Sequence, residues 1–386
     1  MNKVLIITGI LPVSAIRHKK IENDILLVTE DEIIARYPDI SFKYIFVFPL
    51  ANKILANFSS KWNSYYELSK RSTFTLRGRN LILLPVILLP QKTFYRNLLV
   101  KISLYLHRKR IDREITEYQP TIFHAQNADI DAFIARMLSK RYNIPYIVTL
   151  RDLNERQDRS LKRNLNKAKS LVAVSQKQMA IGEGLSKNII TFLPHGVKES
   201  FYGDFDKRRT VKFPIRLITV ARLLKWKNID LIVRTLAKVQ YEYVYDIYGD
   251  GPEKEIIQHL ILSLGLENRI RLRGFVKNDT LPTILQQYDL FVMVSYPETL
   301  GRVYFEAMAS GLSVIASKDT GIDGIVTNGC QGYLVDHRSE VELQGVLELI
   351  GSNPDILLEN AVNASLLAQN YRWENISKIY HDLYVE

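Results

Sequence analysis

Apolar runs typical of buried strands alternate with helical patterns along nearly the whole chain of 386 residues, and the alternation starts afresh in the second half. Parallel strands need long crossover connections, which are usually helices, so this alternation predicts parallel sheets with helices on both faces. Two consecutive series without a shared sheet predict two Rossmann-like, doubly wound domains that face a cleft. The predicted fold class is therefore α/β.

The predicted strands of the first series are Val4–Thr8, Tyr44–Phe48, Leu81–Leu84, Ile122–Ala125, Tyr146–Leu150, Leu171–Val174 and Ile189–Leu193. Those of the second series are Arg216–Val220, Val244–Tyr248, Ile270–Arg273, Leu290–Val294, Ser313–Ala316 and Gly332–Val335. The predicted helices between them include Lys101–Tyr118, Ile130–Arg141, Ile229–Val239, Glu253–Ser263 and Leu281–Tyr288. Neither series has a G-x-G-x-x-G fingerprint after its first strand, which argues against a dinucleotide-dependent dehydrogenase.

The polar, aperiodic segment Gly203–Arg209 separates the two series and is predicted to be a linker. The expected domains are residues 1–200 and residues 201–370. Residues 371–386 are expected to form a C-terminal helix, because apolar residues recur at helical spacing from Trp373 to Tyr384. This helix is predicted to cross back onto the first domain.

Composition places the chain among ordinary globular proteins, with 47% hydrophobic and 24% charged residues. Cys330 is the single cysteine, so no internal disulfide is possible, which fits a reducing compartment. No apolar run approaches the ~20 residues of a transmembrane helix. The first residues loosely imitate a signal peptide, but Gly9 and Pro12 interrupt the apolar run, so a buried strand is the preferred interpretation. A cytoplasmic location is expected.

Positive charge is concentrated in the first half. Residues 1–200 hold 32 Lys and Arg against 17 Asp and Glu, and residues 51–110 hold 12 basic groups against one acid, Glu67. The same stretch has eight aromatic residues, including Trp62 and Tyr105. Basic groups interleaved with aromatics favour an anionic membrane surface as partner. The alternatives are nucleic acid, which we do not expect, and a solvated face that only aids solubility.

The segment between a predicted strand at Leu290–Ser295 and a predicted helix at Arg302–Ser310 has the pattern of a ligand site. The backbone N–H groups of Leu300, Gly301 and Arg302 would be unpaired at the positive end of that helix, where a phosphate binds readily. Gly301 has no Cβ, so a ligand can approach the backbone closely.

Two glutamates, Glu298 and Glu306, flank this glycine. At about 1.5 Å per helical residue, their carboxylates would lie roughly 10–12 Å apart, a span that suits a diphosphate with a hydroxyl-bearing ring at each end. The simpler alternative is a pair of solvated charges beside a loop. The strand–loop–helix context favours a nucleotide-sugar site.

A second anchor follows the strand Arg216–Val220, because doubly wound domains bind ligands at strand ends. Arg222 and Lys227 lie in the loop there, where they could grip a diphosphate, Arg through its planar fork and Lys as a point charge. Lys225 is the less favoured contact. The alternative is an ordinary basic loop.

With these motifs the chain resembles glycosyltransferase family 4, within glycosyl transferases group 1, whose members are retaining enzymes with the GT-B fold. The resemblance covers the C-terminal half and rests on five segments: Phe192–Val197, Ala221–Asn228, Gly249–Glu253, Arg271–Val276 and Glu298–Gly311. In Ala221–Asn228 both glycines that usually flank the family's element are replaced.

The resemblance implies that residues 1–200 bind the acceptor and residues 201–370 bind the nucleotide sugar, and it implies roles for the matching positions. Arg222 and Lys227 would neutralise the departing diphosphate, together with the backbone of Thr299, Leu300 and Gly301. Glu306 would accept hydrogen bonds from the ribose, Glu298 would contact the donor sugar near the reacting carbon, and backbone groups near Phe275 would meet the base.

The first half departs from the family pattern. A histidine-containing element of the family appears as His124-Ala125-Gln126, and a later histidine–aspartate pair appears as Arg151-Asp152. His124 is the candidate for a group near the reacting carbon, with a packed strand-end histidine as the equal alternative. Arg151 is a candidate contact for an anionic acceptor.

No metal or separate cofactor is expected, because the cationic groups can carry the leaving-group charge. The D-x-D pairs Asp129/Asp131 and Asp204/Asp206 resemble metal–nucleotide motifs, but the first starts a predicted helix and the second lies in the linker. Both receive little weight as metal sites.

The predicted function is transfer of a hexose from a UDP- or GDP-sugar, with retention, to a lipid-linked or surface polysaccharide at the inner face of the cell membrane. One alternative is a nucleotide-sugar epimerase on the same architecture, which would convert donor without acceptor. The other is a non-catalytic, membrane-docked scaffold, which would bind donor without turnover.

Overall fold

The computed structural model describes residues 1–11, 25–87, 93–151, 153, 158–203 and 211–385. The chain divides into two compact units. The first unit comprises Met1–Val174, Gln178–Leu193 and Ser377–Glu386, and the second comprises Ser175–Lys177 and Pro194–Ile376. Most of the predicted linker falls on residues 204–210, which lie outside the described residues.

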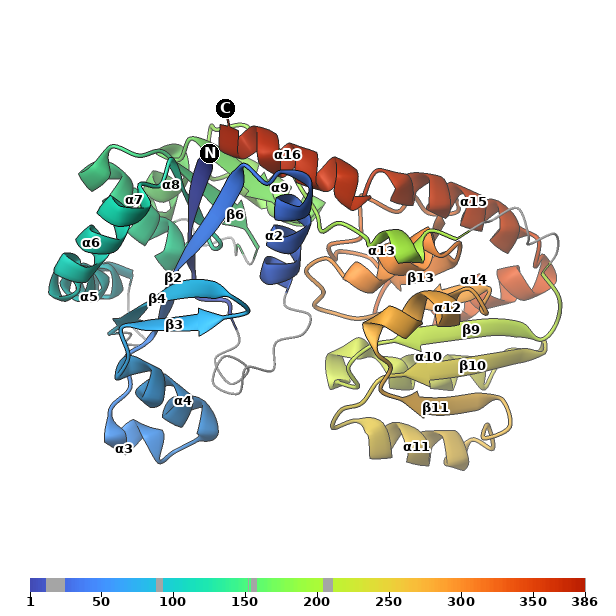
Figure 1. Cartoon of the computed structure of the whole chain (residues 1–386). Coiled ribbons are helices and arrows are strands. Elements are labelled where there is room, and N and C mark those ends of the chain that lie inside the picture. Colours follow the sequence, from blue (N-terminus) through green and yellow to red (C-terminus); the bar gives the residue numbers. More distant parts are fainter. Residues whose placement is uncertain (12–24, 88–92, 152, 154–157, 204–210, 386) are drawn as a thin grey trace. The chain divides into compact units, whose positions relative to one another are not determined.

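The first unit is built on an eight-stranded sheet of order β3-β4-β2-β1-β5-β6-β7-β8 (Figure 1). All neighbouring strands pair in parallel except β3 and β4, which are antiparallel. The strands are β1 (Asn2–Thr8), β2 (Ile40–Pro49), β3 (Thr73–Leu76), β4 (Arg79–Val86), β5 (Ile122–Ala125), β6 (Tyr146–Leu150), β7 (Ser170–Ala173) and β8 (Ile190–Phe192).

The edge strand β3 was not expected from the sequence. Its buried residues, Phe74 and Leu76, alternate with exposed threonines, so it forms no continuous apolar run. Arg77 and Gly78 both have positive φ, at 48° and 77°, and they form the two-residue turn to β4. Such a turn matches the twist of a hairpin and is the local signal that predicts one.

The helices of the first unit surround this sheet, and the C-terminal helix joins them through its last residues. They are α2 (Ile25–Arg36), α3 (Lys53–Ala56), α4 (Ser60–Ser69), α5 (Thr93–Leu106), α6 (Arg108–Tyr118), α7 (Ile130–Tyr142), α8 (Arg159–Asn166), α9 (Gln176–Glu183) and α16 (Trp373–Val385). The single helix predicted at Lys101–Tyr118 is wrong, because the chain breaks at His107 into α5 and α6. The apolar pattern continues across the break and conceals it.

The second unit is built on a fully parallel six-stranded sheet of order β11-β10-β9-β12-β13-β14. The strands are β9 (Ile215–Val220), β10 (Tyr243–Tyr248), β11 (Ile270–Gly274), β12 (Leu290–Val292), β13 (Ser313–Ser317) and β14 (Gly332–Val335). In chain order this is the 3-2-1-4-5-6 arrangement of the Rossmann fold, whose direction reverses between β9 and β12. All six predicted strands are present, and ligands of such folds bind at that reversal point.

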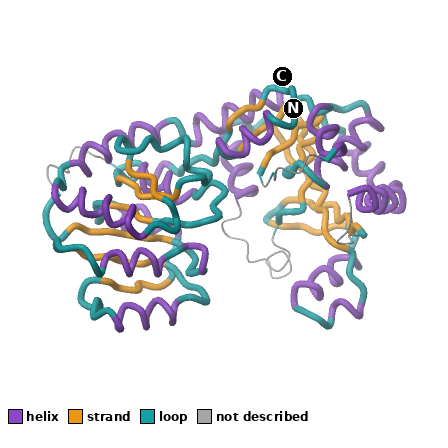
Figure 2. Tube along the Cα trace, turned by 180° about the vertical axis from the view of Figure 1, so that it is seen from behind, coloured by secondary structure: helices purple, strands orange, loops and turns teal. Residues whose placement is uncertain are grey.

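Helices cover both faces of the second sheet, as Figure 2 shows from behind with the strands in orange. They are α10 (Ile229–Leu236), α11 (Lys254–Ser263), α12 (Leu281–Leu285), α13 (Arg302–Ala309), α14 (Glu340–Ser352) and α15 (Ile356–Gln369), with short 3-10 turns η1 (Glu199–Phe201), η3 (Lys225–Lys227) and η4 (Asn278–Thr280). Strands enclosed on both faces are mostly apolar, which explains the apolar runs of the central strands in the sequence. Among the described residues, no helix has the length and apolarity needed to span a bilayer.

Candidate active site

The two loops that carry the predicted anchors meet where the strand order reverses, because β9 and β12 are neighbours. The N–H of Tyr296 donates to the carbonyl of Trp226, at 2.8 Å, which joins the loop after β12 to the loop after β9. The side-chain amide of Asn228 donates to the carbonyls of Val294 and His337, at 2.9 and 3.1 Å. Asn228 has a φ of 51°, a left-handed conformation that asparagine tolerates, so it replaces a family glycine without loss of the turn.

Lys227 and Glu298 form the charged centre of the site. Lys227 Nζ lies 2.5 Å from Glu298 Oε2, and both side chains are about 15% exposed. The hydroxyl of Ser295 donates to the same carboxylate oxygen at 3.0 Å. These contacts hold Glu298 in one position and leave it accessible. A carboxylate fixed in this way beside an ammonium group is suited to contact a ligand that becomes cationic.

The beginning of α13 presents backbone donors directly after Glu298. Gly301 has a φ of 73° and no side-chain cap is present. Among the described residues, the N–H groups of Leu300, Gly301 and Arg302 have no hydrogen-bond acceptor. A Cβ on Gly301 would lie 2.5 Å from the ring of Tyr304, so glycine is required here. The N–H groups and the helix dipole together attract an anion.

A third loop, after β13, supports the Glu298 segment. The N–H of Gly321 donates to the carbonyl of Glu298 at 2.9 Å. A Cβ on Gly321 would lie 1.7 Å from the carbonyl oxygen of Thr299, so no other residue fits without movement of the backbone.

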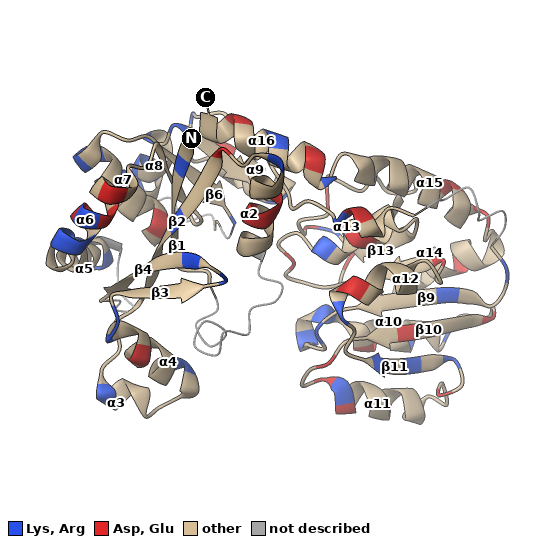
Figure 3. Ribbon diagram, in the orientation of Figure 1, with Lys and Arg blue, Asp and Glu red and all other residues tan. Residues whose placement is uncertain are grey.

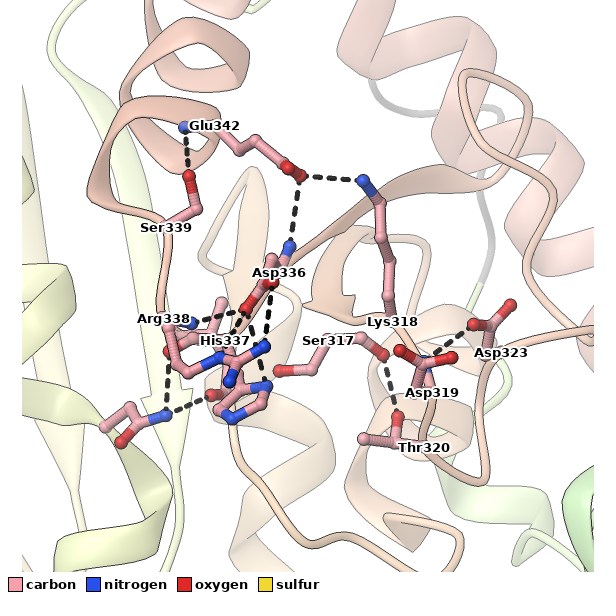
Figure 4. A network of polar contacts seen from close by, with 12 residues as sticks. Ser317, Lys318, Asp319, Thr320, Asp323, Asp336, His337, Arg338, Ser339 and Glu342 are labelled. Atoms are coloured by element: carbon pink, nitrogen blue, oxygen red, sulfur yellow. Dashed lines mark hydrogen bonds and ion pairs between the residues drawn. The ribbon is translucent and has the colours of Figure 1, made fainter.

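Polar contacts fix the loops after β13 and β14 from within (Figure 4). Lys318 pairs with Glu342 at 2.7 Å, and the same carboxylate accepts from the N–H of Asp336 at 3.1 Å. Thr320 donates to the carbonyl of Ser317 at 2.7 Å. Through Glu342 these contacts tie the residues that follow β13 and β14 to the start of α14.

Glu306 lies one turn into α13 and is partly buried. Burial raises the pKa of its carboxyl, and this shift is opposed by the charge of Arg302 and by a hydrogen bond with Asn278. A carboxylate with few protein donors in such surroundings gains from hydroxyl donors of a ligand. This geometry is compatible with the predicted contact with a ribose.

Arg222 and Phe275 are the exposed members of the predicted set. Arg222 follows β9, and its guanidinium has no partner among the described residues. Phe275 is 77% exposed and follows β11, two strands away from β9 in the sheet. Both lie at the carboxyl ends of their strands, as Lys227 and Glu298 do.

The glycine turn after β10 brings the β9 loop close to its neighbour. A Cβ on Gly249 would lie 1.8 Å from the carbonyl oxygen of Ala221, and one on Gly251 would lie 2.3 Å from that of Leu223. The N–H of Leu223 donates to the carbonyl of Asp250 at 3.0 Å. This packing positions the backbone on either side of Arg222.

Residues 204–365 match the family model of glycosyl transferases group 1. The match covers less than half of the chain. The predicted resemblance is thereby confirmed for the group, and membership of family 4 stays a prediction.

Two curated proteins match part of this chain. The chain is 33% identical over 172 residues to an alpha-monoglucosyldiacylglycerol synthase of Acholeplasma laidlawii, covering 44% of this chain and 43% of the relative. It is 28% identical over 169 residues to a lipopolysaccharide core biosynthesis glycosyltransferase of Rhizobium meliloti, covering 44% of this chain and 48% of the relative. The chain thus spans about half the length of the curated relatives it matches.

Solved structures of glycosyltransferases share the fold of both units. Sucrose-phosphate synthase of Thermosynechococcus elongatus has a TM-score of 0.70 at 18% identity, covering 100% of this chain and 98% of that chain. HepE of Anabaena, solved with UDP, has a TM-score of 0.68 at 19% identity, covering 99% of each. The predicted GT-B fold class with two Rossmann-like domains is confirmed.

His124 lies outside the matched residues 204–365, on β5 of the first unit, and is only 1% exposed. Its Nδ1 lies 2.8 Å from the hydroxyl of Tyr384 on α16, and its Nε2 lies 2.7 Å from the hydroxyl of Thr149 on β6. Burial lowers the pKa of His124 to about 3, and the charge of Arg151 adds to this shift. Both ring nitrogens are engaged, which matches the alternative of a packed strand-end histidine.

Acidification is expected to destabilise the protein through His124. The unfolded chain binds a proton at about pH 6.5 and the folded chain only near pH 3, so stability is lost as the pH falls between these values, by up to about 1.4 kcal/mol per pH unit. His124→Gln should flatten this loss in thermal unfolding at pH 7, 5.5 and 4, whereas His259→Gln, at an exposed position, should not. If both variants lost stability with falling pH to the same extent and His124→Gln also lost most of its sugar transfer, the result would instead support a catalytic His124.

The acidic pairs do not form a metal site in the part of the chain that is described. Asp129 pairs with Arg96, and Asp131 is buried and accepts from the N–H of Gly9 at 3.3 Å. No group of three histidine, cysteine or acidic residues is gathered among the described residues. Asp204 and Asp206 lie outside them, and metal independence remains a prediction.

Of the predicted residues, the structure brings Lys227 into contact with Glu298 and places the Thr299–Gly301 backbone directly after it. Sequence reasoning missed Ser295, Asn228 and Gly321. Gly321 was visible as a glycine after a strand, but the backbone that it must accommodate is distant in sequence.

Proposed function

We propose that this protein is a retaining glycosyltransferase that moves a hexose from a nucleotide-diphosphate sugar to a lipid-linked or surface-polysaccharide acceptor. The observation that carries the proposal is the Lys227–Glu298 pair, followed at once by the unpaired N–H groups of Leu300 and Gly301. Cation, carboxylate and helix terminus converge where a Rossmann sheet binds its ligand.

Glycosyl transfer passes through an oxocarbenium-like state, in which the sugar becomes cationic while negative charge grows on the departing diphosphate. In the proposed mechanism Arg222, Lys227 and the start of α13 stabilise the diphosphate, and no metal is needed. Glu298 contacts the sugar beside the reacting carbon. Fixed donors of this kind act without reorganisation at the moment of reaction.

The nature of the partners is proposed from the relatives. Structures with similar folds were solved with UDP and with UDP-glucose, which favours a UDP-sugar donor over a GDP-sugar. The curated relatives are named for a glucosyldiacylglycerol and for the lipopolysaccharide core, which favours a lipid-linked acceptor.

We further propose that the protein works at the inner face of the cell membrane and docks through residues 51–110. Exposed apolar side chains occur near both ends of this stretch. The exposed fraction is 71% for Ile54 and 76% for Phe58, in and just after α3, and 63% for Tyr105 on α5. Lys53, Lys61 and Arg108 lie within three residues of them in the sequence. Cosedimentation with anionic vesicles that is lost at high salt is the expected behaviour.

A thermal-shift panel of UDP-, GDP- and ADP-sugars tests the donor site. A donor at 100 times its Kd adds about 2.7 kcal/mol of stability, so the correct nucleotide should raise the unfolding midpoint by several degrees. Arg222→Ala should reduce this shift, whereas Lys225→Ala should leave it unchanged. Equal shifts in both variants would argue against a diphosphate at the β9 loop.

Turnover distinguishes the remaining functions. The transferase should consume donor only when an acceptor is present, and it should remain active in EDTA. Conversion of donor alone would identify an epimerase, and saturable donor binding without turnover across a range of lipid acceptors would identify a scaffold.

A further inference from the structure

A cavity of about 360 Å³ lies in the first unit between α5, α6 and α7. Its floor is apolar and consists of Leu104, Ile111, Met137 and Leu138. Ile111 and Leu138 belong to the core of this unit, so the floor is fixed by the fold. The volume falls in the range of about 300–1,000 Å³ that is usual for small-molecule sites.

Cations form the rim of this cavity. Lys101 is exposed and has no partner among the described residues. The guanidinium of Arg108 lies 4.0 Å from the ring centre of Tyr105, which also lines the cavity. Arg141 pairs with Asp112 at 2.5 Å, so one rim charge is balanced. The rim therefore keeps the positive charge of Lys101 and Arg108.

An exposed apolar stripe runs along α5 to the cavity. Leu98, Ile102 and Tyr105 are 46%, 41% and 63% exposed, and their spacing of four and three residues places them on one face of the helix. Lys101 stands beside this stripe, and the end of α6 next to α5 is basic (Figure 3). An apolar helix face flanked by cations is typical of a surface that lies in a lipid headgroup region.

We infer that this cavity binds one acyl chain of an anionic lipid, with the phosphate of its headgroup held by Lys101 and Arg108. The apolar floor accounts for the acyl chain, and Lys101 and Arg108, neither of which has a carboxylate partner among the described residues, account for the phosphate. An acidic peptide would use the charges but would leave the apolar floor without a matching group. The inference rests on the proposed membrane location and is independent of sugar transfer.

The test is binding of monomeric phosphatidylglycerol with six-carbon chains, measured by calorimetry without donor or acceptor. One saturable site is expected, with much weaker binding of phosphatidylcholine of the same chain length and no competition by inorganic phosphate. Lys101→Ala and Arg108→Ala should each weaken binding about 5-fold. Met137→Trp should fill the cavity and weaken binding at least 10-fold.

Lys109→Ala and Lys140→Ala are the matched controls, because both lysines are exposed near the cavity but do not line it. Donor-induced thermal shifts in every variant report whether the protein is folded and the sugar site intact. Loss of lipid binding with a normal donor shift would support the inference. Equal binding of phosphatidylcholine, unchanged binding by Met137→Trp, or equal losses in the controls would overturn it, as would displacement of the lipid by an acidic helical peptide.

Discussion

Replacing Lys227 by alanine is expected to lower the rate of sugar transfer about 100- to 1,000-fold, because one fixed donor at a developing negative charge contributes roughly 3–4 kcal/mol to the barrier. Lys227 is the cation nearest to Glu298, at 2.5 Å, and it lies in the loop at the reversal point of the sheet. The loss should appear mainly in kcat, since the diphosphate charge is largest in the transition state.

The matched control is Lys225→Ala. Lys225 lies in the same turn but is exposed and without a partner among the described residues, so its removal should change kcat less than 3-fold. Thermal unfolding of both variants separates catalysis from folding, because removal of Lys227 also deprives Glu298 of its ion pair. Equal losses for the two lysines would show that only the overall charge of the loop matters.

Replacing Glu298 by alanine is expected to abolish measurable transfer while the fold survives. Its carboxylate is the acidic group held by both Lys227 and Ser295, and it precedes the start of α13 by only a few residues. Removing it eliminates the negative charge beside the proposed cationic sugar. Initial rates with a confirmed donor and acceptor provide the measurement.

Glu298→Gln refines this experiment, because glutamine keeps the shape and an acceptor for Ser295 but lacks the charge. A comparable loss in both variants would assign the effect to charge, and restored activity in Glu298→Gln would assign it to hydrogen bonding. Glu267→Gln, at an exposed position after α11, serves as the control for loss of one negative charge. Normal turnover in soluble Glu298→Ala would remove Glu298 from the mechanism.

The central strands of the second unit were predictable because strands that are buried on both faces are mostly apolar. β9 and β13, for example, lie within one residue of their predicted limits. β3 was not predicted because it is an edge strand in which buried and exposed residues alternate. The break at His107 was not predicted because the residues on both sides continue one helical pattern.

The candidate site was predictable where its chemistry is local. Gly301, Glu298 and Glu306 lie within one strand–loop–helix segment, so their spacing alone indicated a phosphate flanked by two carboxylates. Ser295 belongs to the same segment, but its hydroxyl is one polar group among several until its direction toward Glu298 is known. The surroundings of His124 were not predictable in this way, because only the tertiary structure shows that both ring nitrogens are engaged.

The sequence by itself determined the two α/β series, the glycine-led start of α13 and the identity of the charged anchors, because these depend on residue type and on spacing along the chain. The tertiary structure alone decided that Lys227 contacts Glu298 and that residue 321 must be a glycine, because the backbone of Thr299 occupies the space of a Cβ there. Those contacts join loops that follow different strands, and strand order within a sheet is set by packing between segments far apart in the chain.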